Sequence, residues 1–139
     1  MQFSIRRIDH IVLRVRDLAV MRDFYMRVLG CTTERVQEAI GLYQLRAGES
    51  LIDLVTVDGK LGREGGAAPG AEGRNLDHFC LRIEPFDVDA LRTWLISQGV
   101  APGDYGQRFG AEGAGPSLYL SDPEGNVVEL KGPPAPSAG

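Results

Sequence analysis

The sequence contains one apolar segment twice, and each copy carries a histidine at its third position. The first copy, IDHIVLRV, spans residues 8–15, and the second, LDHFCLRI, spans residues 76–83. His10 and His78 are the only histidines in the 139-residue chain. A repeat of this kind indicates a duplicated structural unit, which constrains the fold more strongly than any single element does.

Each copy is followed by a segment with helical periodicity that ends in glycine. Residues 17–30 and 87–99 place apolar side chains at steps of three and four, and Asp17 and Asp87 are suitable N-caps. Beyond each helix, runs of apolar and β-branched residues predict three short strands. Each half therefore reads as β-α-β-β-β, and we predict an α+β fold of two such modules in one domain over residues 1–139.

The boundaries follow from composition. Module one covers about residues 6–57 and module two residues 76–132. Residues 58–75 are rich in glycine and short side chains, which predicts a linker or a mobile loop because little apolar surface is available to offset its ordering entropy. Residues 133–139 are expected to form a frayed tail.

Charge and hydropathy exclude several classes of partner. A net charge of −4 and a pI near 5.1 predict no binding to nucleic acid or to an anionic membrane surface. The apolar runs are shorter than the roughly 18 residues that a membrane span needs, and the N-terminus lacks the apolar stretch of a secretory signal. We expect a cytoplasmic protein in which Cys31 and Cys80 are reduced thiols.

Two acids lie in matching apolar strands that close the two halves. Asp53 lies in LIDLV and Glu129 in VVELK, where an unpaired charge is costly to bury. If the halves form a pseudo-symmetric curved sheet, these acids and the two histidines converge on its concave face. Two imidazoles with one or two carboxylates suit a divalent first-row metal and leave positions open for water or substrate. The alternatives are hydrogen-bonded core histidines and acids that face solvent on edge strands.

The segments DHIVLRVRDL…FYMRVLG, LDHFCLRI and LYLSDPEGNVVELKG resemble the vicinal oxygen chelate superfamily, and most of all its small glyoxalase I-like proteins. The superfamily includes glyoxalase I, fosfomycin-resistance thiol transferases, extradiol dioxygenases, methylmalonyl-CoA epimerases and bleomycin-binding proteins. The resemblance extends from about Arg7 to Lys131. It implies two βαβββ modules that form an open, curved mixed β-barrel around a metal ion.

The resemblance also implies the ligands. His10, His78 and Glu129 take the positions of metal ligands, and Asp53 takes the position of a fourth ligand, where glyoxalase I normally has glutamate. Aspartate is one methylene shorter, so direct ligation by Asp53 and a water-bridged role both remain open. The implied cofactor is one divalent ion per site, which would be Ni, Zn, Mn, Co or Fe.

A substrate-binding role for Arg14 is implied in the same way. Small glyoxalases carry an arginine four residues after the first histidine, where it contacts a glutathione carboxylate, and Arg14 has that position here. Where those proteins have an asparagine this chain has Val57, so the glutathione site is only half matched. A solvated Arg14 at the strand end is the alternative.

The function implied is a metal-dependent lyase or isomerase of the glyoxalase type. Its substrate would be a small molecule with vicinal oxygens, such as the hemithioacetal of a 2-oxoaldehyde and a thiol, with Glu129 as the first candidate base and Asp53 as the second. The alternatives are an Fe(II) dioxygenase or thiol transferase of the same superfamily, and a metal-free protein that binds small molecules. Related small proteins imply a homodimer with sites shared between subunits, although closure within one chain is also open.

Residues that line the cavity are harder to assign, because a register error of one residue moves a side chain to the other face of a strand. Five polar or aromatic candidates are therefore left outside the predicted site: Tyr43, Gln44, Arg46, Arg108 and Tyr119.

Overall fold

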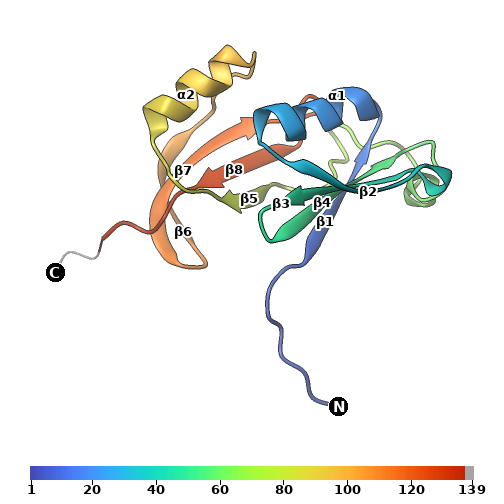
Figure 1. The fold of residues 1–139 in the computed structure, drawn as a ribbon, viewed down its shortest axis with the longest axis horizontal. Coiled ribbons are helices and arrows are strands. Elements are labelled where there is room, and N and C mark those ends of the chain that lie inside the picture. Colours follow the sequence, from blue (N-terminus) through green and yellow to red (C-terminus); the bar gives the residue numbers. More distant parts are fainter. Residues whose placement is uncertain (137–139) are drawn as a thin grey trace. The chain divides into compact units, whose positions relative to one another are not determined.

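The computed structural model describes residues 1–136, and its backbone divides into two units, Met1–Asn75 and Leu76–Gly139 (Figure 1). Each unit has the β-α-β-β-β order that the repeat predicts, with one four-stranded mixed sheet. The α+β fold of two open, curved modules is therefore confirmed. Residues 137–139 of the predicted tail lie outside the described residues, whereas the backbone amide of Ala135 donates to the carbonyl of Ala114 at 2.9 Å.

The sheet of the first unit has the strand order β1-β4-β3-β2. β1 pairs with β4 in parallel, and the other neighbours are antiparallel. Its elements are β1 (His10–Val15), α1 (Leu18–Asp23), η1 (Phe24–Val28), β2 (Thr32–Gln37), η2 (Glu38–Ile40), β3 (Leu42–Ala47), β4 (Ser50–Thr56) and η3 (Gly62–Gly65).

The second unit repeats this pattern with the order β5-β8-β7-β6. β5 and β8 are parallel, which again brings the first and last strands of the module side by side. Its elements are β5 (Phe79–Arg82), α2 (Val88–Ser97), β6 (Tyr105–Gly110), β7 (Gly113–Ser121) and β8 (Val127–Lys131).

Both helices begin where the sequence predicts. The Asp17 side chain accepts from the amide of Val20 at 3.2 Å, and the Asp87 side chain accepts from the amide of Ala90 at 3.0 Å. These bonds satisfy amide groups that have no partner within the first turn of a helix. Of the described residues, none belongs to a helix long and apolar enough to cross a bilayer.

The first helix changes its winding after Asp23. Residues Phe24–Val28 form a π-helical turn, η1, instead of the regular helix that the periodicity predicts. A π turn carries more residues per turn and so broadens the buried stripe. The neighbouring side chains of Phe24 and Tyr25 are both buried, and their rings meet edge to face with centroids 5.0 Å apart.

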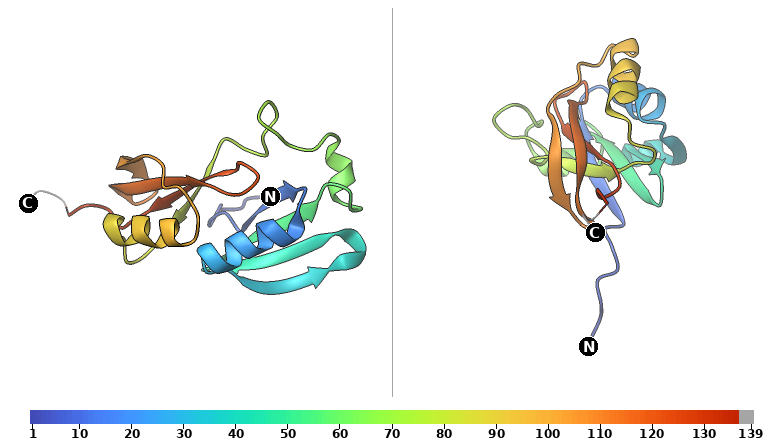
Figure 2. Two further views of the ribbon diagram at one scale, coloured as in Figure 1. Left: turned by 90° about the horizontal axis from the view of Figure 1, so that it is seen from above. Right: turned by 90° about the vertical axis from the view of Figure 1, so that its left-hand side faces the viewer.

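The helix covers one face of the first sheet and leaves the other face open (Figure 2). Along β1, Leu13 is 1% exposed and faces the core, whereas its neighbour Val12 is 49% exposed. Because side chains alternate along a strand, His10 and Arg14 share the open face with Val12. The open face is therefore the one that carries the predicted site.

Residues 58–75 are joined to β1 by hydrogen bonds. The guanidinium of Arg14 donates to the carbonyls of Gly62, Gly66 and Ala67 at 2.7–3.1 Å. The Asn75 side chain donates to the Arg14 carbonyl at 3.0 Å and accepts from its amide at 3.2 Å. Hydrogen bonds to an arginine distant in sequence thus hold this segment on the first unit, in place of apolar burial.

The segment also depends on the absence of a side chain at Gly62. A Cβ atom built on Gly62 would lie 1.8 Å from the carbonyl oxygen of Thr56. We predict that Gly62→Ala lowers the free energy of unfolding by about 1–3 kcal/mol, the usual cost of adding a methyl group to filled space. Gly73→Ala, where a Cβ would meet nothing within 4 Å, should change it by less than about 0.5 kcal/mol. Urea unfolding followed by far-UV circular dichroism measures both, and equal effects of the two substitutions would contradict this account.

Candidate metal centre: two histidine–carboxylate pairs

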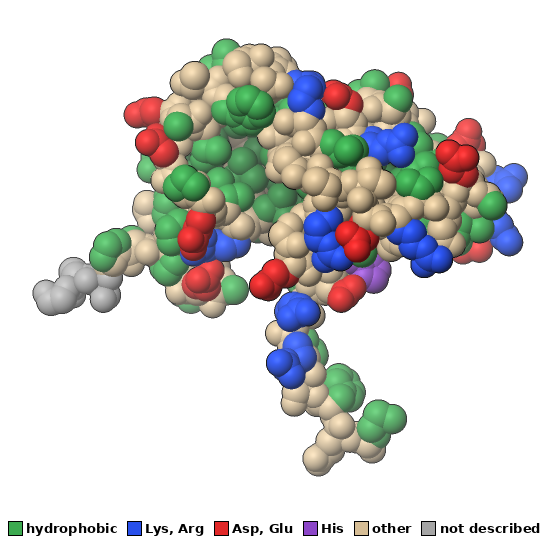
Figure 3. Space-filling model, viewed as in Figure 1, with side chains coloured by type: hydrophobic (Ala, Val, Ile, Leu, Met, Phe, Trp, Pro, Cys, Tyr) green, Lys and Arg blue, Asp and Glu red, His purple; other side chains and the backbone are tan. Residues whose placement is uncertain are grey.

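The first pair lies on the parallel strands of the first unit. His10 is the first residue of β1 and stands opposite Leu51 on β4, so Asp53 follows two residues further along on the same face. His10 Nε2 lies 4.0 Å from Asp53 Oδ2. The carboxylate is buried while the imidazole is half-exposed, so the pair can be reached from solvent on the histidine side. Figure 3 shows one histidine side chain at the surface among charged neighbours.

The second pair repeats this geometry in the second unit. Cys80 on β5 stands opposite Glu129 on β8, as Val12 stands opposite Asp53. His78 therefore has the same offset from its acid as the first histidine, and His78 Nε2 lies 3.2 Å from Glu129 Oε1. Glu129 is buried. The structure thus brings each predicted histidine together with one predicted acid, within a unit.

Both imidazoles are oriented by the aspartate that precedes them. His10 Nδ1 lies 2.8 Å from Asp9 Oδ2, and His78 Nδ1 lies 2.5 Å from Asp77 Oδ2. These hydrogen bonds raise the pKa of both histidines above its usual value, although burial opposes the shift. A carboxylate on Nδ1 leaves Nε2 facing the acid, an arrangement common behind metal-bound histidines. Sequence reasoning missed these two aspartates, although the Asp-His dipeptide recurs in both copies of the repeat.

Glu129 is surrounded by polar side chains. The hydroxyl of Ser117 donates to Glu129 Oε2 at 2.6 Å, and Cys80 and Tyr119 stand opposite Glu129 on the two neighbouring strands. Burial alone would raise the pKa of Glu129, but these polar groups and the nearby His78 outweigh burial and lower it. Glu129 is therefore fixed as an anion on the open face of its sheet.

Cys80 shares this environment as a neutral thiol. Desolvation, with a further contribution from Glu129, raises the pKa of the Cys80 thiol to about 11. A thiol with that pKa is almost entirely protonated at neutral pH and makes a poor nucleophile. We therefore assign no covalent chemistry to Cys80.

Asp53 is less completely satisfied than Glu129. Gln44 Nε2 donates to Asp53 Oδ2 at 3.2 Å. Within residues 1–136, Asp53 Oδ1 is the one buried side-chain nitrogen or oxygen that has no hydrogen-bond partner. An orphaned carboxylate oxygen is costly to bury, and a cation beside it would remove that cost.

The chemistry of these residues fits a divalent ion. Two ligands bound at about 2.1 Å to one ion lie roughly 3 Å apart, close to the 3.2 Å between His78 Nε2 and Glu129 Oε1. The 4.0 Å between His10 Nε2 and Asp53 Oδ2 needs only a small adjustment. The part of the chain that the structure describes holds no cluster of three or more such ligands. Each unit therefore presents two candidate ligands.

Two side chains left unassigned by sequence reasoning belong to this centre. Gln44 stands opposite Asp53 on β3, and Tyr119 stands opposite Glu129 on β7, so they are equivalent positions of the two modules. The repeat would have identified Gln44 and Tyr119 as equivalent if the strand register had been known. No feature of the sequence pointed to Ser117. Arg14, expected near the substrate, has its guanidinium bound to the carbonyls of residues 62–67.

Comparison with known proteins supports the predicted family. The family model for the Glyoxalase/Bleomycin resistance protein/Dioxygenase superfamily matches residues 7–130. Comparison with curated protein sequences gives no match.

Solved structures share this fold over nearly the whole chain. A virulence protein from Salmonella typhimurium is 25% identical, with a TM-score of 0.77 over 94% of this chain and 99% of its own. A lactoylglutathione lyase from Agrobacterium tumefaciens is 21% identical, with a TM-score of 0.65 over 91% and 92%. TnmS3, an antibiotic binding protein from Streptomyces sp. CB03234, is 24% identical, with a TM-score of 0.63 over 95% and 99%.

The last two likenesses concern the fold alone, and their different activities show that the fold does not specify a reaction. The repeated modules, their paired histidines and acids, and the match to residues 7–130 agree with one another. The chain belongs to the glyoxalase/bleomycin resistance protein/dioxygenase superfamily.

Proposed function

We propose that this protein is a metal-dependent lyase or isomerase of the glyoxalase type. Its substrate is a small molecule with vicinal oxygens, such as the hemithioacetal of a 2-oxoaldehyde and a thiol. The observation that carries the proposal is a buried carboxylate beside an imidazole on the open face of each sheet, Asp53 with His10 and Glu129 with His78. Within residues 1–136, Oδ1 of Asp53 is in addition buried without a hydrogen-bond partner. The cytoplasmic location expected from the sequence stays a prediction.

Four side chains would hold the ion: His10, Asp53, His78 and Glu129. Each unit supplies one imidazole and one carboxylate, so all four ligands require one first unit and one second unit. The two units could come from one chain or from the two chains of a homodimer. When bound, the divalent ion, which would be Ni, Zn, Mn, Co or Fe, supplies Lewis-acid polarisation of adjacent substrate oxygens. Asp9 and Asp77 hold the two imidazoles with Nε2 turned toward the acid of the same unit, where the ion would bind between them.

The contacts of the two acids suggest different roles. Sequence reasoning ranks Glu129 first as the base, but Ser117 and His78 already contact its two carboxylate oxygens, at 2.6 and 3.2 Å. Asp53 has one donor, Gln44, and its Oδ1 accepts nothing. We therefore assign Asp53 Oδ1 to accept the proton from one substrate carbon and return it to the neighbouring carbon. Glu129 then remains a fixed ligand.

Metal uptake tests the ligand set. Protein purified without chelator should bind divalent metal, and His10→Ala or His78→Ala should each weaken binding at least 10-fold, because each removes one of four ligands. Asp9→Ala should weaken binding about 10- to 100-fold through loss of the bond to His10 Nδ1. Asp23→Asn, which alters an exposed ion pair between Asp23 at the end of α1 and Arg27 on η1, is the matched control and should bind metal normally.

Equilibrium dialysis with elemental analysis measures these affinities and identifies the preferred ion. A wild-type protein that takes up no divalent metal, or two histidine variants that bind as tightly as wild type, would overturn the ligand set. That result would favour a metal-free protein that binds small molecules.

Activity tests the assignment of the base. With methylglyoxal and a panel of thiols, Asp53→Asn should lower kcat by about 10²- to 10⁴-fold, the usual contribution of a positioned base. Glu129→Gln should instead weaken metal binding. The same metal-loaded protein is tested for oxygen uptake with catechols and for thiol transfer to an epoxide. Turnover in either of these assays without isomerisation of the hemithioacetal would replace the proposed reaction by a dioxygenase or a thiol transferase.

A further inference from the structure

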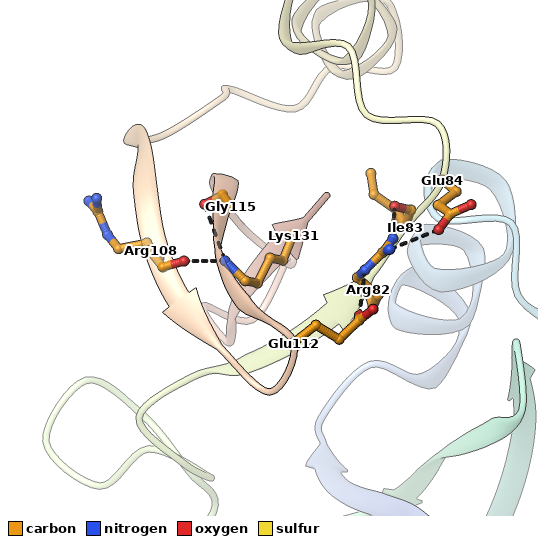
Figure 4. Close-up of polar contacts among 7 residues, drawn as sticks. All are labelled: Arg82, Ile83, Glu84, Arg108, Glu112, Gly115 and Lys131. Atoms are coloured by element: carbon orange, nitrogen blue, oxygen red, sulfur yellow. Dashed lines mark hydrogen bonds and ion pairs between the residues drawn. The ribbon is translucent and has the colours of Figure 1, made fainter. Parts of the chain in front are cut away.

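Lys131, at the end of β8, is a buried cation. Only 6% of the residue is exposed, and it is one of two lysines in a chain that has 15 basic residues. Its Nζ donates to the backbone carbonyls of Arg108 and Gly115, the latter at 3.2 Å (Figure 4). Two of the three N–H bonds of the ammonium group are thus used within the second unit.

Within residues 1–136, no carboxylate forms an ion pair with this ammonium group. Among the ion pairs formed by residues 1–136, none includes Lys131. Glu129 lies two residues away on the same face, but its oxygens accept from Ser117 and face His78. A buried charge without a partner of opposite sign is strongly unfavourable. The third N–H of Lys131 therefore remains for a ligand.

The neighbouring cation, Arg82, is paired with carboxylates, unlike Lys131. Arg82 on β5 stands directly opposite Lys131 in the strand register. Its guanidinium donates to Glu112 at 2.7 Å, to Glu84 at 2.8 Å and to the carbonyl of Ile83 at 2.8 Å (Figure 4). Two carboxylates therefore already neutralise Arg82, so of these two opposed cations only Lys131 lacks a carboxylate partner among the described residues.

A cavity lies beside this lysine, entirely within the second unit. Its volume is about 340 Å³, within the usual range for small-molecule sites, and Lys131, Glu129 and His78 are among its lining residues. Residues 109–113, at the turn between β6 and β7, form another wall. A Cβ atom on Gly110 would lie 2.6 Å from Cε of Lys131, so the lysine chain passes over this glycine. The metal-ligand pair of this unit and the unneutralised ammonium group thus share one cavity.

We propose that this cavity is an oxyanion subsite, in which Lys131 binds a carboxylate or phosphate group of a small ligand. The ion pair Arg82–Glu112 holds the β6–β7 turn as its wall. This inference deepens the proposed function and, for substrate turnover, rests on it: the substrate carries an anionic arm in addition to its vicinal oxygens. Binding of the anion itself requires no turnover.

The composition of the chain makes a direct test possible. Protein labelled with ¹³C at lysine Cε gives two side-chain signals, which Lys60→Met assigns. Inorganic phosphate, acetate and methylphosphonate are titrated against sodium chloride at equal ionic strength. We expect a saturable shift of the Lys131 signal and no saturable shift of the exposed Lys60. Tighter binding of phosphate and methylphosphonate assigns a phosphate-type arm, and tighter binding of acetate assigns a carboxylate.

Thermal unfolding supplies a second readout. The preferred anion should raise the Tm of wild type and of Lys60→Met, and binding to Lys131→Met should be at least tenfold weaker. The measurement on the wild-type lysine signals stands even if Lys131→Met fails to fold. A Lys131 signal that none of the three anions saturates, or equal shifts at both lysines, would overturn the subsite.

The two proposals fail separately. Saturable anion binding at Lys131 in a protein that takes up no metal would retain the subsite and overturn the lyase. Metal binding and hemithioacetal turnover with no anion effect at Lys131 would overturn the subsite and retain the lyase.

Discussion

Each sheet of this protein buries an acid on a central strand. Asp53 and Glu129 are 3% and 6% exposed, and both strands are hydrogen-bonded on both sides. A buried carboxylate is stable only with donors or positive charge around it. The parallel pairing of the first and last strands of each module meets that need, because it sets a histidine beside the acid. The repeat in the sequence therefore stabilises the buried acid of each module in the same way, with a histidine beside it.

The two copies have diverged in how completely they satisfy the acid. Glu129 has Ser117, Tyr119, Cys80 and His78 around it, whereas Asp53 has Gln44 and a more distant His10. A carboxylate held by several polar neighbours is rigid and weakly basic. Oδ1 of Asp53 has no hydrogen-bond partner within residues 1–136, so this acid is held less firmly. A duplicated module thus yields two acids suited to different tasks from one backbone plan.

Short-range periodicity made much of this molecule predictable. Helical steps of three and four and alternation along strands predict the two modules, their N-caps and the faces that carry the histidines and acids. The contacts that could not be predicted from the sequence depend on how strands and loops are placed relative to one another. The bonds of Arg14 to residues 62–67 and the donation from Ser117 to Glu129 join residues far apart in sequence or depend on strand register. The π-helical turn after Asp23 depends on how the helix packs, which helical periodicity does not report.

In the second unit, a negative and a positive side chain follow one another along the same face of β8, and their spacing restricts which ligands fit. Glu129 and Lys131 are two residues apart on β8, so their Cα atoms lie roughly 6.6 Å apart on the same face. The Glu129 position offers a carboxylate and the imidazole of His78, and the Lys131 position offers an ammonium group without a counter-charge. A ligand of three or four carbons, with two adjacent oxygens at one end and an anionic group at the other, matches that spacing. A neutral 2-oxoaldehyde would leave Lys131 unneutralised. On the proposed function, the electrostatics of this face would therefore favour substrates in which the thiol or the aldehyde contributes a negative charge.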